Sequence, residues 1–209
     1  MLAVLLYGLD AVAHAADSAL APTAWMTVPS ITGRLRAADI GLVINTADPY
    51  SVAVGEHYIA ARGLAPQQVL RLALPLRDRL RSDEFEALRA AVAAHFGAAT
   101  QALALAWTTP FAVECNSITG ALALGFDAGL CLQTCAPSRP SNYFNSPSHR
   151  PLQSHGWRPS MLLAAPGIDE AKALIDRGVA ADGSLSLRGR PPVTAMMLAT
   201  DDAARRVRM

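Results

Sequence analysis

The 209-residue sequence has little charge and almost no lysine. Charged residues make up 17% of it, and 18 basic and 17 acidic side chains leave a net charge of +1. Lys172 is the single lysine, so arginine supplies nearly all of the positive charge. A chain without a strong field of one sign has no general electrostatic attraction for nucleic acid or for an anionic membrane surface. We therefore expect neither as a partner.

Long apolar runs and the common nucleotide-binding motifs are also lacking. No apolar run reaches the roughly 18 residues that a membrane-spanning helix needs. Neither GxGxxG nor GxxxxGK[ST] occurs, so the common phosphate-binding loops give no basis for a nucleotide site, and we expect no cofactor. The sequence does have 52% apolar residues. That content is ample for a folded core, and the length predicts one large domain.

The first 16 residues have the pattern of an export signal. An apolar stretch at 2–9 precedes Ala13-His14-Ala15, which is a small-x-small cleavage pattern. The pattern departs from the ordinary one because it has no Lys or Arg before the apolar stretch and contains Asp10. We expect a signal peptide at 1–16 and export to the periplasm or the exterior. An ordinary apolar helix or strand is the alternative.

From residue 39 onward, short apolar runs alternate with amphipathic stretches. The apolar runs predict strands at 39–45, 68–74, 101–107, 161–165 and 194–199. The amphipathic stretches predict helices at 49–62, 82–97 and 169–180. This alternation predicts an α/β domain over 39–209, with a mostly parallel sheet, flanking helices and a Rossmann-like or caspase-like topology. Residues 17–38 are expected to form a linker or an N-terminal arm.

Two segments depart from this alternation. Residues 131–160 contain five prolines and form a long irregular stretch, of the kind that often carries function or faces a partner. Residues 201–209 have the pattern of a helix that stops soon after it begins. We therefore expect that the chain is truncated at its C-terminus, as the N-terminal portion of a longer protein.

Polar side chains follow two of the predicted strands. In an open parallel sheet, ligands bind beyond the carboxyl ends of the strands, so these side chains are candidate binding residues. They are Asn45, Asp48, Ser51, Thr108, Thr109 and Asn116. For Asp48 and Ser51 the alternative is that they only cap the helix that follows.

The same edge of the sheet contains a candidate nucleophile. The candidate catalytic residues are Cys115, Glu114, His149 and His155. A nucleophilic cysteine needs a general base, usually His, within hydrogen-bond reach. His57 and His95 fall in predicted helices, whereas His149 and His155 lie in the irregular stretch and could approach Cys115. A buried, inert Cys115 is the alternative.

The three cysteines cannot all pair within the chain. If the protein is exported, Cys131 and Cys135 are expected to form a disulfide across a short loop and leave Cys115 free; in a reducing compartment all three would be thiols. A zinc site built from these cysteines and His149 or His155 is a further alternative. The spacing is not the paired CxxC pattern of zinc sites, and we expect no metal.

As a set, the motifs resemble a known family. The segments IGLVIN at 40–45, DPYS at 48–51 and VGEHYIAARGLAPQQVL at 54–70 resemble an uncharacterised family of bacterial exported proteins that accompanies the exosortase (PEP-CTERM) sorting system. The segments WTTPF at 107–111 and SITGAL at 117–122 also match. The resemblance covers about residues 39–208. It implies association with the sorting of surface and extracellular-matrix proteins, and longer chains with a Gly-rich C-terminal half.

These observations leave three functional hypotheses. The first is an exported accessory protein of the exosortase-associated system, non-catalytic or catalytically incomplete in this chain, with exported or surface proteins as partners. The second is a hydrolase, similar by fold analogy alone to caspase- and gingipain-like cysteine peptidases, with most active residues beyond Met209. The third is a binding module that uses the stretch 131–160.

Overall fold

The computed structural model describes residues 35–133, 141–143 and 146–182 of the chain. Its strands are β1 (Ile40–Asn45), β2 (Val69–Leu72), β3 (Arg79–Leu80), β4 (Ala102–Leu105), β5 (Ala112–Val113), β6 (Asn116–Ser117) and β7 (Ser160–Leu162). Its helices are α1 (Pro49–Arg62), α2 (Ser82–His95), α3 (Ile118–Leu124), α4 (Gly129–Leu132), α5 (Pro151–His155) and α6 (Ile168–Ala180). The predicted signal peptide, most of the predicted arm, the predicted strand at 194–199 and the segment 201–209 lie outside the described residues.

The main sheet has four parallel strands in the order β2-β1-β4-β7. At its centre, Val43 of β1 lies between Leu70 of β2 and Leu105 of β4. Four of the five predicted strands and all three predicted helices are present, with ends that shift by a few residues. The prediction of an α/β fold with a mostly parallel sheet and flanking helices is therefore confirmed.

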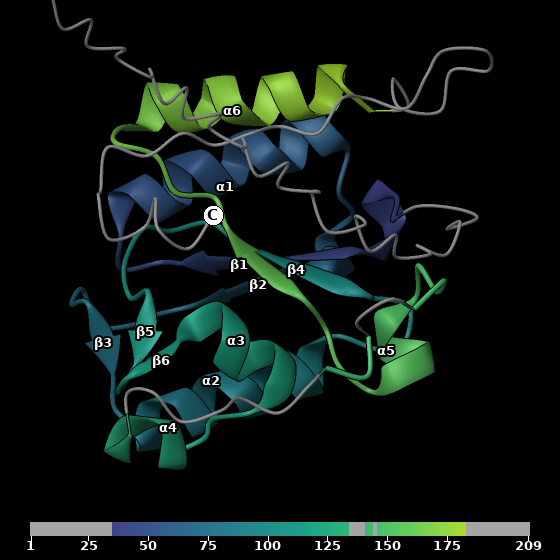
Figure 1. The fold of residues 1–209 in the computed structure, drawn as a ribbon. Coiled ribbons are helices and arrows are strands. Elements are labelled where there is room, and N and C mark those ends of the chain that lie inside the picture. Colours follow the sequence, from purple (N-terminus) through teal and green to yellow (C-terminus); the bar gives the residue numbers. More distant parts are fainter. Residues whose placement is uncertain (1–34, 134–140, 144–145, 183–209) are drawn as a thin grey trace, which may run out of the picture.

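Helices cover both faces of this sheet (Figure 1). Helices α1 and α6 lie on one face, where they pack against Leu42 and Ile44. Helices α2 and α3 lie on the other face, where they pack against Val43. Because side chains of a strand alternate between its faces, β1 supplies both halves of the core, and its residues from Gly41 to Asn45 are buried.

Helix α1 has sequence signals at both ends. The side chain of Asp48 caps it by accepting a hydrogen bond from the backbone N–H of Tyr50, and Pro49 fits the first turn because that position needs no N–H donor. Gly63 ends the helix at φ 61°, a left-handed conformation that glycine adopts at little cost. The capping role that the sequence allowed for Asp48 is thus confirmed.

A second, small sheet lies at the carboxyl end of the main sheet. Strand β5 pairs in parallel with β3 and antiparallel with β6. The chain enters β3 after β2 and enters β5 after β4, so both connections start at the carboxyl ends of parallel strands (Figure 1). These three strands and α3 were not predicted from the sequence.

The irregular stretch begins within the short helix α4, contains the short helix α5, and is partly anchored to the amino end of β4. The side-chain oxygen of Gln101 accepts hydrogen bonds from the backbone N–H groups of Leu152 and Gln153. The Arg158 guanidinium donates to the carbonyl oxygens of Phe96, Gly97 and Thr100, and burial lowers the pKa of this arginine. These bonds hold α5 at the end of the sheet opposite to β3, β5 and β6 (Figure 1).

Within the described ranges, no helix has both the length and the apolar content needed to cross a membrane.

Candidate functional site

Asn45, the polar residue at the carboxyl end of β1, is fully buried, and both polar atoms of its side chain form hydrogen bonds. Its side-chain oxygen accepts from the backbone N–H groups of Leu74 and Ala47, and its Nδ2 donates to the carbonyl oxygen of Leu74. Its own backbone N–H donates to the hydroxyl of Ser51 at 2.8 Å. These bonds fix the chain leaving β1 and the chain leaving β2. They leave Asn45 and Ser51 in structural roles, since both side chains are buried.

Tyr50 connects the start of α1 to the segment that follows β7. Its hydroxyl donates to the carbonyl oxygen of Leu163 and accepts from the backbone N–H of Ala165, both at 2.9 Å. Burial raises the pKa of Tyr50, with the N–H of Ala165 acting in the opposite direction. The carboxyl ends of β1 and β7 are therefore joined by a protein side chain at the place where a ligand of a parallel sheet often binds.

Thr108 and Thr109 lie in a closed turn after β4. The peptide bond between Thr109 and Pro110 is cis, and the buried Trp107 indole donates to the carbonyl oxygen of Pro110 at 2.9 Å. The two threonines are half-buried in this turn. The turn directs the chain into β5, which is how β4 leads to the small sheet.

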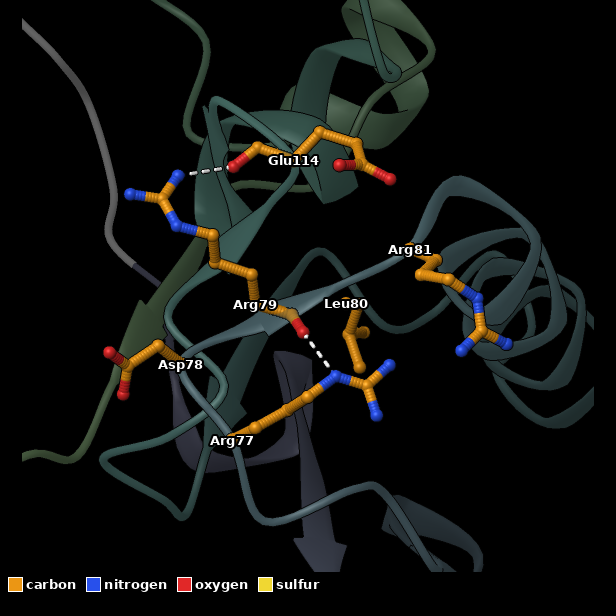
Figure 2. A pocket seen from close by; sticks show the side chains of 6 residues that line it. All are labelled: Arg77, Asp78, Arg79, Leu80, Arg81 and Glu114. Atoms are coloured by element: carbon orange, nitrogen blue, oxygen red, sulfur yellow. Dashed lines mark hydrogen bonds between the residues drawn. The ribbon is translucent and has the colours of Figure 1, made fainter.

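An arginine-lined groove lies beside the small sheet (Figure 2). It encloses about 560 Å³, and its lining residues are Arg77, Asp78, Arg79, Leu80, Arg81 and Glu114. The three arginines occupy alternate positions along β3 and its flanks, and Glu114 comes from the tight connection between β5 and β6. We call this feature the arginine groove. The groove was not predicted from the sequence, although three arginines stand within five residues in RDRLR at 77–81.

Two of the three arginines share one carboxylate. Glu84, in the first turn of α2, contacts the guanidinium groups of both Arg77 and Arg81, and it also accepts from the backbone N–H of Arg81 at 2.8 Å. These contacts lower the pKa of Glu84, the backbone hydrogen bond from Arg81 being the largest cause. The Arg81 side chain also bonds Asp83 and lowers the pKa of that carboxyl group. Arg77 and Arg81 are therefore already neutralised by the protein.

Arg79 differs from its neighbours. It donates to the backbone carbonyl oxygen of Glu114, which Figure 2 shows on the far side of β3 from the Arg77 and Arg81 guanidinium groups. Across the described ranges it forms no ion pair with a carboxylate. The Glu114 carboxylate instead accepts from the backbone N–H of Ser82 at 3.3 Å. Arg79 is thus an exposed cation with donors to spare, at the carboxyl end of the sheet.

The cysteine prediction was wrong in its pairing. The structure joins Cys115 to Cys131, with the two Cα atoms 5.3 Å apart, so Cys131 does not pair with Cys135 and Cys115 is not free. Cys135 lies outside the described residues. The pairing follows from the fold, because the side chain of Asn116 binds the backbone of Asp127 and so brings the segment before α4 beside the β5–β6 connection. In this oxidised state Cys115 has no thiolate to act as a nucleophile.

The predicted pairing of Cys115 with a histidine is not formed. His155 lies in α5, where its ring contacts the hydroxyl of Ser146 at 3.0 Å and packs edge-on against Tyr143. Helix α5, which begins two residues after His149, is held at the amino end of β4. Cys115 lies between β5 and β6, and Figure 1 shows these strands at the opposite end of the sheet from α5. Glu114 and Asn116 do lie beside Cys115: Glu114 precedes it with φ 48°, and the Asn116 amide contacts its sulfur atom.

The remaining described titratable groups do not assemble a metal centre. In the part of the chain that the structure describes, no three His, Cys, Asp or Glu side chains group together in a way that could hold a metal ion. His57 instead forms a contact of 2.7 Å with Asp176, which joins α1 to α6. The arginine groove and the adjacent disulfide are therefore the features with available chemistry at the carboxyl end of the sheet.

Comparison with known proteins returned no match: no family model, no curated protein and no solved structure is similar to this chain.

Proposed function

We propose that this chain is an exported, non-catalytic accessory protein of an exosortase-related sorting system, and that it binds carboxylate-bearing segments of other exported proteins in the arginine groove. The observation that carries the proposal is Arg79, an exposed guanidinium at the carboxyl end of the sheet with no carboxylate partner among the described residues. A guanidinium offers parallel N–H donors that match the two oxygens of a carboxylate.

The charge around the groove favours a single carboxylate over a phosphate. The three arginines stand beside Asp78, Asp83, Glu84 and Glu114. A phosphate with about two negative charges would be repelled by this surplus of acid, whereas one carboxylate needs only the charge of Arg79. A peptide segment that presents one acidic side chain to Arg79 is therefore the ligand class that this groove suits best.

Two further observations support the remaining parts of the proposal. A disulfide between Cys115 and Cys131 is typical of proteins in oxidising compartments, which supports export. The same disulfide removes the thiol of the candidate nucleophile, which supports a non-catalytic role. Association with a sorting system rests on the resemblance of the motifs at 40–45, 48–51 and 54–70.

Binding of a synthetic acidic peptide tests the proposal. We expect a fluorescent, C-terminally amidated peptide with a single Glu side chain to bind, and the same peptide with Gln in its place to bind at least about tenfold more weakly, since a hydrogen bond to a charged group contributes about 1.5–3 kcal/mol. Fluorescence anisotropy measures both affinities at low salt. The Arg79→Gln variant should lose about tenfold in affinity for the acidic peptide.

Arg89→Gln is the matched control. Arg89 is also an exposed arginine, but it lies on α2, pairs with Glu86 and does not line the groove. It should bind the acidic peptide like the unsubstituted protein. Equal weakening by both substitutions would show a diffuse charge effect and would overturn the proposed site, as would equal binding of the acidic and amide peptides.

A further inference from the structure

The Cys115–Cys131 disulfide lies at the surface. Both cysteines are exposed, Cys115 in the connection between β5 and β6 and Cys131 in the short helix α4. A disulfide is opened by direct attack of a thiolate on one of its sulfur atoms, so access to the sulfur decides whether the reaction can begin. A bridge that only stabilises the fold needs no such access.

The side-chain amide of Asn116 lies against the same bridge. Its Nδ2 is 3.3 Å from Sγ of Cys115 and 3.7 Å from Sγ of Cys131. Two bonds to the backbone of Asp127 hold this amide in place: Nδ2 donates to the carbonyl oxygen at 3.0 Å, and Oδ1 accepts from the N–H at 3.4 Å. One N–H of the amide therefore serves the protein backbone and the other faces the sulfur atoms.

An N–H donor at this position acts differently on a disulfide and on a thiolate. A disulfide sulfur is a weak, neutral acceptor, whereas a hydrogen bond to a charged acceptor is about twice as strong as a neutral one. Asn116 therefore stabilises a thiolate that forms on Cys115 more than it stabilises the bridge. The nearby carboxylates of Glu114 and Asp127 oppose a thiolate, and both have other donors, the N–H groups of Ser82 and Gly129.

We propose that the Cys115–Cys131 bridge is a site of thiol–disulfide exchange with a thiol-bearing partner protein, in which Asn116 stabilises Cys115 as the leaving thiolate. The partner's thiolate attacks Sγ of Cys131, a new S–S bond forms there, and the Cys115–Cys131 bond breaks with its electron pair on Sγ of Cys115. A second thiolate of the partner then attacks the partner's sulfur atom that is bonded to Cys131. A disulfide forms within the partner, and Cys131 leaves as a thiolate. Two electrons and two protons pass to this chain, and the partner gains a disulfide.

The proposal makes a prediction that a merely structural bridge does not make. Because Asn116 Nδ2 lies closer to Cys115 than to Cys131, the attacking thiol should become attached to Cys131. The probe is reduced glutathione, added to the folded protein in a Cys135→Ser background so that the third thiol cannot compete. Acid quenching and peptide mass spectrometry then give the rate of opening and the cysteine that carries the adduct.

We expect the glutathione adduct on Cys131 in at least about a fivefold excess over Cys115. Asn116→Ala should slow opening several-fold and remove this preference. Ser117→Ala is the control, because Ser117 caps α3 through Gly120 and does not contact either sulfur atom; it should leave the preference unchanged. If Asn116→Ala fails to fold, the preference of the glutathione adduct for Cys131 over Cys115, measured with Asn116 present, still tests the proposal.

Three results would overturn the proposal. They are opening that occurs only in urea, equal adducts on both cysteines of the folded protein, and a preference for Cys131 that persists in Asn116→Ala. None of these results depends on whether the arginine groove binds acidic peptides, so the two proposals fail or stand separately.

Discussion

The guanidinium of Arg79 donates a hydrogen bond to the carbonyl oxygen of Glu114, the residue immediately before the disulfide-bonded Cys115. One side of the arginine groove is thus set by a backbone segment that the disulfide restrains. Glu114 also has φ 48°, an uncommon value for a residue other than glycine. The state of the bridge and the position of Arg79 should therefore be coupled.

This coupling predicts that loss of the bridge weakens binding in the groove. The Cys131→Ser variant frees the segment at Glu114, and we expect it to bind an acidic peptide about fivefold more weakly, at the low end of ordinary coupling between sites. Fluorescence anisotropy checks this under oxidising conditions. Cys135→Ser, which leaves the Cys115–Cys131 bridge intact, should bind normally; the same affinity in both variants would contradict the coupling.

A second prediction concerns the buried amide at the end of β1. The Asn45→Ala substitution leaves the N–H and carbonyl groups of the buried Leu74 without their partner, whereas the N–H of Ala47, which is exposed, can bond water instead. Because unpaired buried polar groups are costly, we expect the free energy of unfolding in urea to fall by about 3 kcal/mol. Thr46 is the next residue and is exposed, so Thr46→Ala should change the free energy of unfolding by less than about 0.5 kcal/mol. Equal effects would show that the amide is dispensable.

A third prediction tests how closely α1 packs on the sheet. A Cβ atom at Gly55 would lie 2.5 Å from Cδ1 and 2.6 Å from Cγ1 of the buried Ile44. Overpacking of this kind costs about 1–3 kcal/mol, which exceeds the helix propensity gained from alanine, so Gly55→Ala should lower the melting temperature. At Gly178 of α6, the atom nearest to an added Cβ would be Nη2 of Arg62, at 3.4 Å. Gly178→Ala should therefore raise the melting temperature. Shifts of the same sign at both sites would refute this account of the packing.

A fourth prediction concerns acid stability. The hydrogen bond from the Arg81 N–H, followed by the contact with Arg77, lowers the pKa of Glu84 in the folded state below its usual value of 4.5. A depressed carboxyl pKa contributes stability that is present above the unfolded pKa and is lost as the pH falls through the folded pKa. Urea midpoints measured from about pH 5 down to about pH 3 should therefore fall more steeply for the unsubstituted protein than for Glu84→Gln. Parallel curves would show that the two arginines do not perturb Glu84.

The strands and helices of the main sheet could be predicted because they carry periodic signals. The apolar run at 40–44 is long enough to mark a buried central strand, and Asp48-Pro49 with Gly63 mark both ends of α1. Strands β3, β5 and β6 have two residues each, which is too short for any period to show. Helix α3 was missed although its cap, the Ser117 hydroxyl that accepts from the N–H of Gly120, was readable in the sequence.

The candidate site was harder to predict because its residues meet only in the folded chain. Sequence spacing favoured Cys131 with Cys135, whereas the bridge joins cysteines 16 positions apart. Asn45 and Ser51 were expected beyond the carboxyl end of a strand, where they do lie. Nothing in the sequence indicated that their side-chain oxygens would accept hydrogen bonds from backbone N–H groups. Arg79 becomes a candidate only in the folded chain, where Arg77 and Arg81 both pair with Glu84 and Arg79 does not.

The order β2-β1-β4-β7 has a consequence for how the sheet is built during synthesis. Among the strands that the structure describes, β1 is made first; it takes an interior place, and the later strands are added outward from it. Its first partner, β2, is 27 residues away in the pair Leu42–Val69, whereas β4 is 62 residues away in the pair Leu42–Ala104. A nascent chain can therefore pair one edge of β1 early, while the backbone N–H and C=O groups on its other edge stay unpaired until β4 has left the ribosome.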